Sequence, residues 1–449
     1  MNSLQQYIDL YTQNEELINK GSHSLVNGNR ADALAKLLRS ELPTRRCEDY
    51  KYTDISKVLA PDFGINLQRL PMQVNLRDSY RCRVPGLGSR LFYVVNDALL
   101  PADSQVDDAH LFVGTLTWFA ERHPDLFRAF YNRIDGDSLV NLNTLLAQDG
   151  VVVYVGEGVK LTEPLQFINL AAGGVPMLTT RRLLVILEQG AEATVLHCNH
   201  AATRQQHTTN EVCEIFMGER SRLQYYSVEE TTPNVHLLNT TDIVQQAYSR
   251  LEYATVTLHS GLSRRGVTIR MAGEGAESEV SGLVVADGEQ HVDNNLLVVH
   301  SAESCRSDML YKYILGDQAV GAFAGKVLVE AGAQHTDSQQ TNANLCVSDK
   351  AHMYTQPMLE IYADDVKCNH GSTVGQLDDA ALFYMAQRGI SPEDGRLLMQ
   401  QAFAWDVLER IPLQPLRHRL MRMVESRFSL GSANCADCGV CDAKRIYND

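Results

Sequence analysis

The stretch VTIRMAGEGAESEVSGLVVADGEQ, residues Val267 to Gln290, consists of short β-branched runs separated by acidic turns that contain glycine. It has no sustained helical period, and short apolar runs bounded by turn residues are typical of strands. The same texture recurs in VVVYVGEGVKL (151–161), RLLVILEQGAEATVL (182–196), CEIFMGERSRLQYY (213–226) and GKVLVEAGAQHTDSQQTNANL (325–345). From about residue 145 to residue 377 the sequence therefore predicts many short, stacked strands.

Two architectures would bury so many strands. An antiparallel sandwich favours tight hairpins with Asn-Gly or Asp-Gly turns, but the pair Asp287-Gly288 lies among irregularly spaced turns. A coil of parallel rungs instead stacks like residues on one another, which suits the polar side chains of SQQTNANL (338–345). We predict a mainly β fold with a right-handed parallel β-helix at its core, and keep the antiparallel sandwich as the alternative.

Helical patterns flank this core. Residues 1–135 form a mainly helical segment in which Leu4, Ile8 and Tyr11 fall on one helix face, and RLFYVVND (90–97) is an isolated strand. The predicted boundaries are an N-terminal helical domain (1–135), a β-helix core (136–377), a C-terminal helical domain (378–428) and a flexible cysteine-rich tail (429–449).

The C-terminal domain is predicted to be a helical hairpin. Ser391 is the expected N-cap of its first helix, with Pro392 at the first helical position. We interpret two apolar stripes as core: Leu398, Ala402, Trp405 and Leu408, then Leu416, Leu420, Met423 and Val424. The cationic face of the second helix is interpreted as solvated: Arg417, Arg419, Arg422 and Arg427.

Composition excludes some functions. A net charge of −15 disfavours a protein that wraps nucleic acid, because phosphate binding needs a basic surface. The first twenty residues lack the basic and apolar regions of a signal peptide, and no apolar run approaches the ~20 residues that span a bilayer. We expect a cytoplasmic protein without membrane or nucleic-acid partners, whose scattered cysteines are mostly small buried hydrophobes.

The stretch KCNHGSTVGQLD (367–378) holds two soft metal donors, Cys368 and His370. Residues i and i+2 of a strand project from the same face, roughly 6.5–7 Å apart at their Cα atoms. Thiolate and imidazole both suit iron. The alternative is an inert thiol and a hydrogen-bonded histidine at a strand end.

Three stretches carry a resemblance to a known family: LPTRRCEDYKYTDISKVL (42–59), LVNLNTLLAQDGVVVYVGEGVKLTEPL (139–165) and the long block from Ser307 to Ser391. Together they resemble the SufB/SufD scaffold family of the Suf iron–sulfur cluster assembly system. The run Cys368-Asn-His370-Gly resembles its SufD-type branch. Asn342 appears where SufB-type chains hold a scaffold cysteine, and the nearby Cys346 is interpreted as core.

The resemblance implies a β-helix between two helical domains and a scaffold without catalytic activity of its own. It implies pairing with a SufB-like subunit through the β-helices and a transient iron–sulfur cluster at that interface, with His370 as ligand and Cys368 as its neighbour. A SufC-like ABC-type ATPase would bind the C-terminal helices around Phe403, Trp405 and Leu408. Since this chain has no Gly-x4-Gly-Lys-Ser/Thr loop, the ATPase is expected on another polypeptide. Flavin on the assembled complex and a homodimer without the partner are further implications.

The tail lies outside the resemblance. Cys435, Cys438 and Cys441 form a C-x2-C-x2-C pattern like the start of a ferredoxin motif, but position 445, where a fourth cysteine would stand, is arginine. The hypothesis is a site for iron or zinc, and the alternative is a redox-exposed tail without metal.

Two rival functions remain. A β-helix enzyme acting on polysaccharides would need clustered carboxylates, for which Asp364 with Asp365 or Asp378 with Asp379 are the candidates. An autonomous iron–sulfur electron carrier would rely on the tail cysteines and would be coloured when purified alone.

Overall fold

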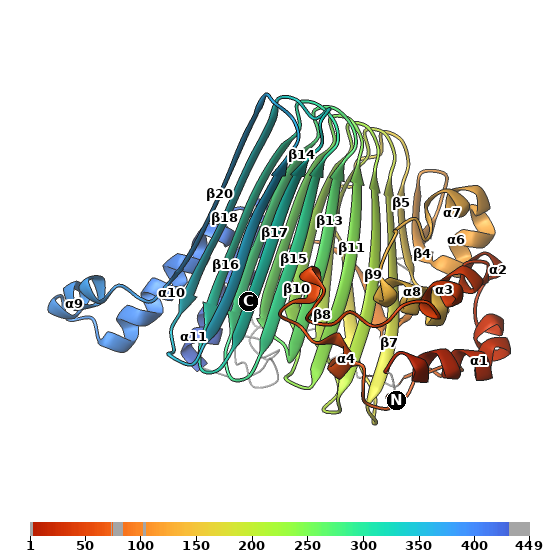
Figure 1. Ribbon diagram of the computed structural model, residues 1–449, viewed down its shortest axis with the longest axis horizontal. Coiled ribbons are helices and arrows are strands. Elements are labelled where there is room, and N and C mark those ends of the chain that lie inside the picture. Colours follow the sequence, from red (N-terminus) through yellow and green to blue (C-terminus); the bar gives the residue numbers. More distant parts are fainter. Residues whose placement is uncertain (1–2, 73, 75–83, 102–104, 431–449) are drawn as a thin grey trace.

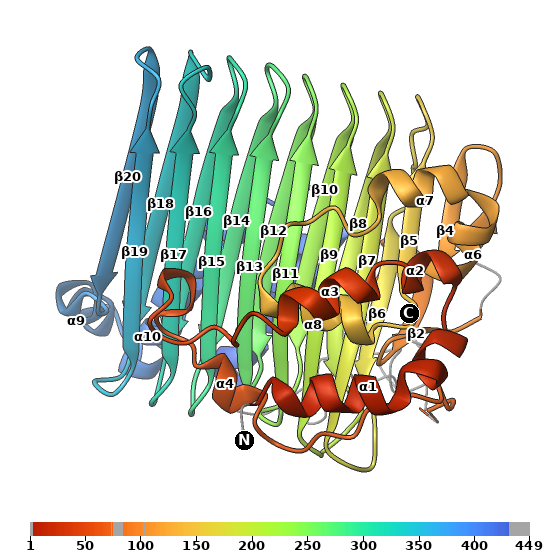
Figure 2. The same cartoon turned by 45° about the vertical axis from the view of Figure 1, so that its right-hand side comes forward.

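Strands stacked in coils form the centre of the protein, with helices at both ends of the chain (Figures 1 and 2). The computed structural model describes residues 3–430 except 73, 75–83 and 102–104. Two ten-stranded sheets face each other, and from β5 onward consecutive strands alternate between them. This arrangement confirms the predicted parallel β-helix and rules out the antiparallel sandwich.

The first sheet is almost entirely parallel; only β2 pairs antiparallel. Its strands, in chain order, are β1 (Arg90–Val95), β2 (Ala98–Leu99), β6 (Leu165–Ala171), β8 (Glu192–Ala201), β10 (Arg222–Glu230), β12 (Arg250–His259), β14 (Glu277–Ala286), β16 (Arg306–Leu315), β18 (Thr336–Cys346) and β20 (Val366–Gly375).

The second sheet is parallel from β5 to β19, while β3 and β4 pair antiparallel at its start. Its strands are β3 (Val106–Asp107), β4 (Leu111–Thr115), β5 (Val151–Val155), β7 (Met177–Leu187), β9 (His207–Met217), β11 (Val235–Gln245), β13 (Leu262–Met271), β15 (His291–His300), β17 (Val320–Val329) and β19 (His352–Ile361).

Side chains inside the coils stack from rung to rung, as expected. One part of the interior is apolar, whereas another part is polar and holds the buried ion pairs Arg181–Glu211 (3.1 Å) and Arg265–Glu229 (2.9 Å). Aromatic rings stack on neighbouring rungs, as in Tyr225 and Tyr253, whose ring planes differ by 4°. Gly282 leaves room for one such ring, because a Cβ there would lie 2.1 Å from Tyr311.

Helices of the N-terminal region lie against the second sheet (Figure 2). They are α1 (Gln5–Lys20), α2 (Ser24–Asn27), α3 (Arg30–Leu37), α4 (Ile55–Val58), α6 (Leu116–Arg122), α7 (Pro124–Phe130) and α8 (Ser138–Leu146), with a 3₁₀ turn at Glu48–Tyr50. The same region also contains β1 and β2, which belong to the first sheet, and β3 and β4, which belong to the second, so it is not purely helical. The four predicted domain boundaries remain predictions.

The C-terminal helices are α9 (Asp379–Gln387), α10 (Pro392–Leu408) and α11 (Gln414–Leu430). Ser391 caps α10 as predicted, since its hydroxyl accepts the Asp394 N–H at 3.0 Å. The second predicted stripe, on α11, is buried against the first sheet. The first stripe is wrong as a core, because Leu398, Ala402 and Trp405 are exposed and only Leu408 is buried.

The physical reason lies in how α10 meets the first sheet. Only its last turns contact β14 and β16, where Ala404, Val407 and Leu408 are buried and Lys312 binds the Phe403 carbonyl at 3.1 Å. The start of α10 and all of α9 extend away from the coils (Figure 1), and α9 buries none of its residues.

Two arginines of α11 are also not solvated as expected. Arg419 and Arg427 are buried, and Arg427 donates to the Leu258 carbonyl at 2.9 Å and pairs with Asp287. Part of this face thus packs against the first sheet, whereas Arg422 is exposed as predicted and Arg417 is half-buried. None of the described helices is long and apolar enough to span a bilayer.

Candidate functional site

The last coil of the β-helix is uncovered. β19 and β20 are the terminal strands of their sheets, so each pairs with a neighbour on one side only (Figure 2). Interior positions of β18 are buried, whereas the positions stacked on them in β20 are half-buried or exposed. The inner face of β20 is therefore a surface of the isolated chain.

Cys368 and His370 lie on this face. Their register partners on β18 are Ser338 and Gln340, both buried inside the coil, so the two side chains point in the same direction as predicted. Cys368 is half-buried in a small aliphatic cluster that includes Val327 and Val329 of β17 and Leu359 of β19. His370 is exposed. The prediction that the two side chains share one face is therefore confirmed. The structure adds that the imidazole of His370 is more exposed than the thiol of Cys368.

Burial, and then the nearby Asp337 carboxylate, raises the pKa of the Cys368 thiol above its ordinary value. Thiolate is the form that binds metal and reacts with electrophiles. Below the raised pKa the thiol is protonated, so metal binding at Cys368 must release a proton and should strengthen as pH rises.

This pKa shift makes a testable prediction. Asp337→Asn removes a negative charge near the thiol, which lowers its pKa and should speed alkylation of Cys368 at pH 7.5 by about two- to threefold. The rate is measured by iodoacetamide labelling and peptide mass spectrometry. Asp349→Asn, on a turn at the other edge of the coils, is the control and should leave the rate unchanged.

A hydrogen-bond network joins the last strands next to His370. The side-chain oxygen of Asn342 accepts from Thr355 at 2.8 Å and from Ser372 at 3.2 Å, and the two hydroxyls lie 2.7 Å apart. The network ties β18, β19 and β20 together and holds β20 in place. Sequence reasoning missed Thr355 and Ser372; the signal was the alternation that places Ser372 on the same face as Cys368 and His370.

Cys368 and His370 are too few to complete an iron site. Among the described residues, no cluster of three or more His, Cys, Asp or Glu side chains could hold a metal ion. Soft thiolate and imidazole donors fit iron and iron–sulfur clusters. Further ligands for such a cargo would have to come from outside the residues that the structure describes.

Two of the four carboxylates considered for a polysaccharide-cleaving enzyme have structural partners. Asp365 pairs with His335 at 3.0 Å, and Asp378 caps α9 by accepting the Ala380 N–H at 2.9 Å. These two contacts give Asp365 and Asp378 structural roles. Cys435, Cys438 and Cys441 lie outside the described residues, so the tail metal site remains a prediction.

Other cysteines behave mostly as predicted. Cys198, Cys213 and Cys305 are buried, whereas Cys47 is exposed. Cys346, interpreted as core, is half-buried against the interior hydrophobic cluster.

The region expected to bind an ATPase has a mixed surface. Trp405 is 42% exposed and Phe403 is half-buried, but Leu408 is 1% exposed and therefore unavailable on the isolated chain. Sequence reasoning missed two exposed aromatic residues of α9, Phe383 and Tyr384. We group them with Leu398 and Trp405 of α10, which are also exposed, under the name α9–α10 apolar surface.

Two protein-family models together match residues 1–403 of the chain. The model for the SufBD core domain of SUF system FeS cluster assembly matches residues 168–403, more than half of the chain, and that for the SufBD protein N-terminal region matches residues 1–167. An iron–sulfur cluster assembly SufBD family protein of Synechocystis is 29% identical, covering 93% of this chain and 95% of its own. The iron–sulfur cluster assembly proteins SufD of Escherichia coli (28%; 89% and 92%) and Bacillus subtilis (23%; 75% and 79%) are also similar.

Proposed function

The chain belongs to the SufBD family of Suf iron–sulfur cluster assembly proteins, and on that premise we propose that it is the SufD-type subunit of a complex with a SufB-like scaffold and a SufC-like ATPase. The cluster is the cargo of this complex, and the subunit itself catalyses no reaction. A cytoplasmic location accompanies the proposal.

One observation carries the proposal: the uncovered coil that presents Cys368 and His370. Its terminal strands leave backbone N–H and C=O groups unpaired toward solvent, which invites strand pairing with another chain. Apolar side chains lie exposed on the same strands or the turn between them: Ile361, Tyr362 and Val374. A second β-helix stacked here would cover them and add the missing ligands.

The chemistry expected of this chain is modest. The imidazole of His370 supplies a lone pair to iron, and Cys368 supplies a thiolate once its proton has left. The network around Asn342 keeps the strand rigid while the partner supplies the other ligands. Purification of the chain co-expressed with a SufB-like and a SufC-like protein tests the assignment, and failure to recover a three-protein complex would contradict it.

The α9–α10 apolar surface is the proposed ATPase contact. Truncating an aromatic residue at the centre of an interface typically costs at least about 2 kcal/mol, or roughly 30-fold in affinity. We expect Trp405→Ala to weaken binding of the SufC-like protein by that factor while the melting temperature stays unchanged, because Trp405 is exposed. Titration calorimetry measures the affinity.

A matched control is Leu38→Ala, which removes an exposed apolar side chain next to α3, away from α9 and α10. Its affinity for the ATPase should equal that of the unmodified chain. Equal weakening by both substitutions would show that Trp405 is not part of a specific contact.

A further inference from the structure

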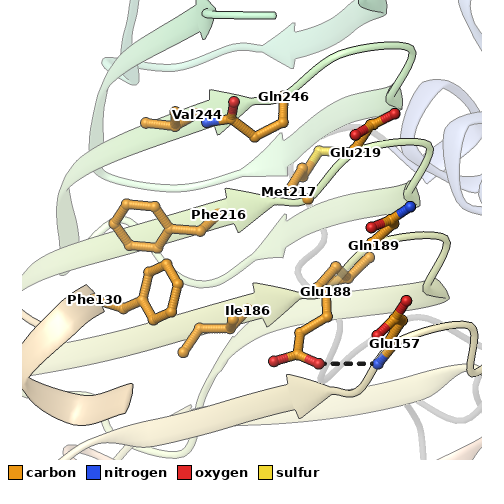
Figure 3. Close-up of a pocket in the computed structure, with 12 residues that line it drawn as sticks. Phe130, Glu157, Ile186, Glu188, Gln189, Phe216, Met217, Glu219, Val244 and Gln246 are labelled. Carbon is orange, nitrogen blue, oxygen red and sulfur yellow. Dashed lines mark hydrogen bonds between the residues drawn. The ribbon is translucent and has the colours of Figure 1, made fainter. Parts of the chain in front are cut away.

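A groove of about 470 Å³ lies on the outer face of the second sheet, far along the coils from the Cys368–His370 face (Figure 3). It spans β5, β7, β9 and β11 near their C-terminal ends, and its wall includes Phe130 at the end of α7. Its volume is within the usual range of ligand sites, roughly 300–1,000 Å³. Cluster assembly at the open coil does not use it.

The floor of the groove is apolar and regular. Ile186, Phe216 and Val244 are register partners on three successive strands, so they form one row across the coils. The ring of Phe130 packs against that of Phe216, with centroids 5.0 Å apart. Figure 3 shows the two rings at one end of the groove and the turn residues at the other.

The wall is fixed in place. Glu214 accepts the backbone N–H groups of Asn132 (3.0 Å) and Arg133 (2.6 Å), directly after α7, and pairs with Arg182 at 2.8 Å. This buried carboxylate attaches the end of α7 to β9. Phe130 is thereby held over the sheet, and the groove is formed before anything binds.

The rim is acidic. Val155, Leu187 and Met217 are register partners, so the residues two positions later, Glu157, Gln189 and Glu219, occupy equivalent places on successive turns. Glu188 and Gln246 stand one position earlier on their turns and also line the groove. Since neighbouring rungs are about 4.8 Å apart, the rim presents its polar groups at close, even intervals.

Local pairing only partly neutralises these carboxylates. Glu219 pairs with Arg220, and Glu188 accepts the Glu157 N–H at 3.0 Å. The Glu157 side chain is exposed to solvent. An apolar floor next to an acidic rim suits a ligand that combines apolar side chains with positive charges. It disfavours a flavin nucleotide, because the negatively charged phosphate would lie near the carboxylates.

We propose that this groove binds an extended segment of a partner protein in which aromatic or large aliphatic side chains alternate with Lys or Arg. The apolar side chains would cover Ile186, Phe216 and Val244, and the cations would lie along the glutamates. The amides of Gln189 and Gln246 would hydrogen-bond the segment's backbone. Because the groove and the open coil lie on different parts of the β-helix, both can be occupied together.

Fluorescence anisotropy with the full-length chain tests the proposal. The probe is a labelled nonapeptide with two phenylalanines flanked by lysines; matched peptides replace the lysines with glutamates or the phenylalanines with alanines. We expect only the first to bind appreciably. Glu157→Lys should weaken it about fivefold, and Phe216→Ala about tenfold or more.

The control substitution is Glu303→Lys, at an exposed turn residue of a later coil on the same edge. It should leave the affinity unchanged, because its charge lies outside the groove. Three results would each overturn the proposal: equal weakening by Glu157→Lys and Glu303→Lys, equal binding of the glutamate peptide, or displacement of the probe by flavin mononucleotide. Glu157 is exposed, so its variant remains informative even if Phe216→Ala destabilises the fold.

Discussion

Replacing His370 with alanine is expected to reduce cluster maturation by the reconstituted three-protein assembly about 100-fold or more, since even residues that merely support metal ligands are worth 10–100-fold. His370 is exposed on the inner face of β20, where no further coil covers it. Its removal therefore deletes a donor without opening a cavity. We expect the melting temperature and the pairing with the SufB-like subunit to stay unchanged.

The measurement is the rate at which the assembly activates an apo-enzyme that needs an iron–sulfur cluster, together with the iron bound by the assembly. His352→Ala is the matched control, because His352 is exposed on the neighbouring terminal strand β19 but has no cysteine two positions away. Full activity of the His370 variant would show that this imidazole is not a ligand, even if the family assignment and the fold stand.

The β-helix could be predicted because its signal is local and repeated. Stretches such as VVVYVGEGVKL show short strands and glycine turns, and polar interior residues such as Asn342 form hydrogen bonds with the neighbouring rungs. Strand register could not be predicted, because parallel partners lie about 30 residues apart and one sequence does not show which residues meet. The buried ion pairs of Glu211 and Glu229 with arginines could not be predicted either, because each pair joins residues from different strands.

The helix stripes show a second limit. Periodicity correctly placed Leu416 and Leu420 in the core, but it assigned Leu398 and Trp405 there too. An apolar stripe indicates that a helix face is buried, but it does not indicate whether the surface that buries it belongs to the same chain or to a partner. The exposed stripe on α10 and the uncovered coil at β20 are both faces of this kind.

For the two proposed iron ligands the local rule was sufficient to place them on one face. Two residues at i and i+2 of a strand share a face whatever the register, so Cys368 and His370 could be placed together from the sequence. Thr355 and Ser372 come from two strands, and their contact with Asn342 depends on the coil geometry. A site built within one strand is thus predictable, whereas a site shared between strands is not.

Replacing Val374 with lysine is expected to abolish pairing with the SufB-like subunit. Val374 is 52% exposed on the open face of β20 in the isolated chain, so the substitution should not lower the melting temperature. In the complex the ammonium group would be buried without a partner, which costs about 3 kcal/mol or more, a loss of roughly 100-fold or greater in affinity. Size-exclusion chromatography and titration of the two subunits measure it.

Val175→Lys is the control, since Val175 is 58% exposed on a turn between β6 and β7, near the opposite end of the β-helix, and should tolerate the charge in both states. Comparison with the His370 variant then separates two roles of the same strand. Lysine at 374 should lose the complex and, as a consequence, the cluster, whereas alanine at 370 should lose the cluster within an intact complex. If the Val374 variant still paired with normal affinity, the open coil would not be the pairing surface, and the missing iron ligands would have to come from elsewhere.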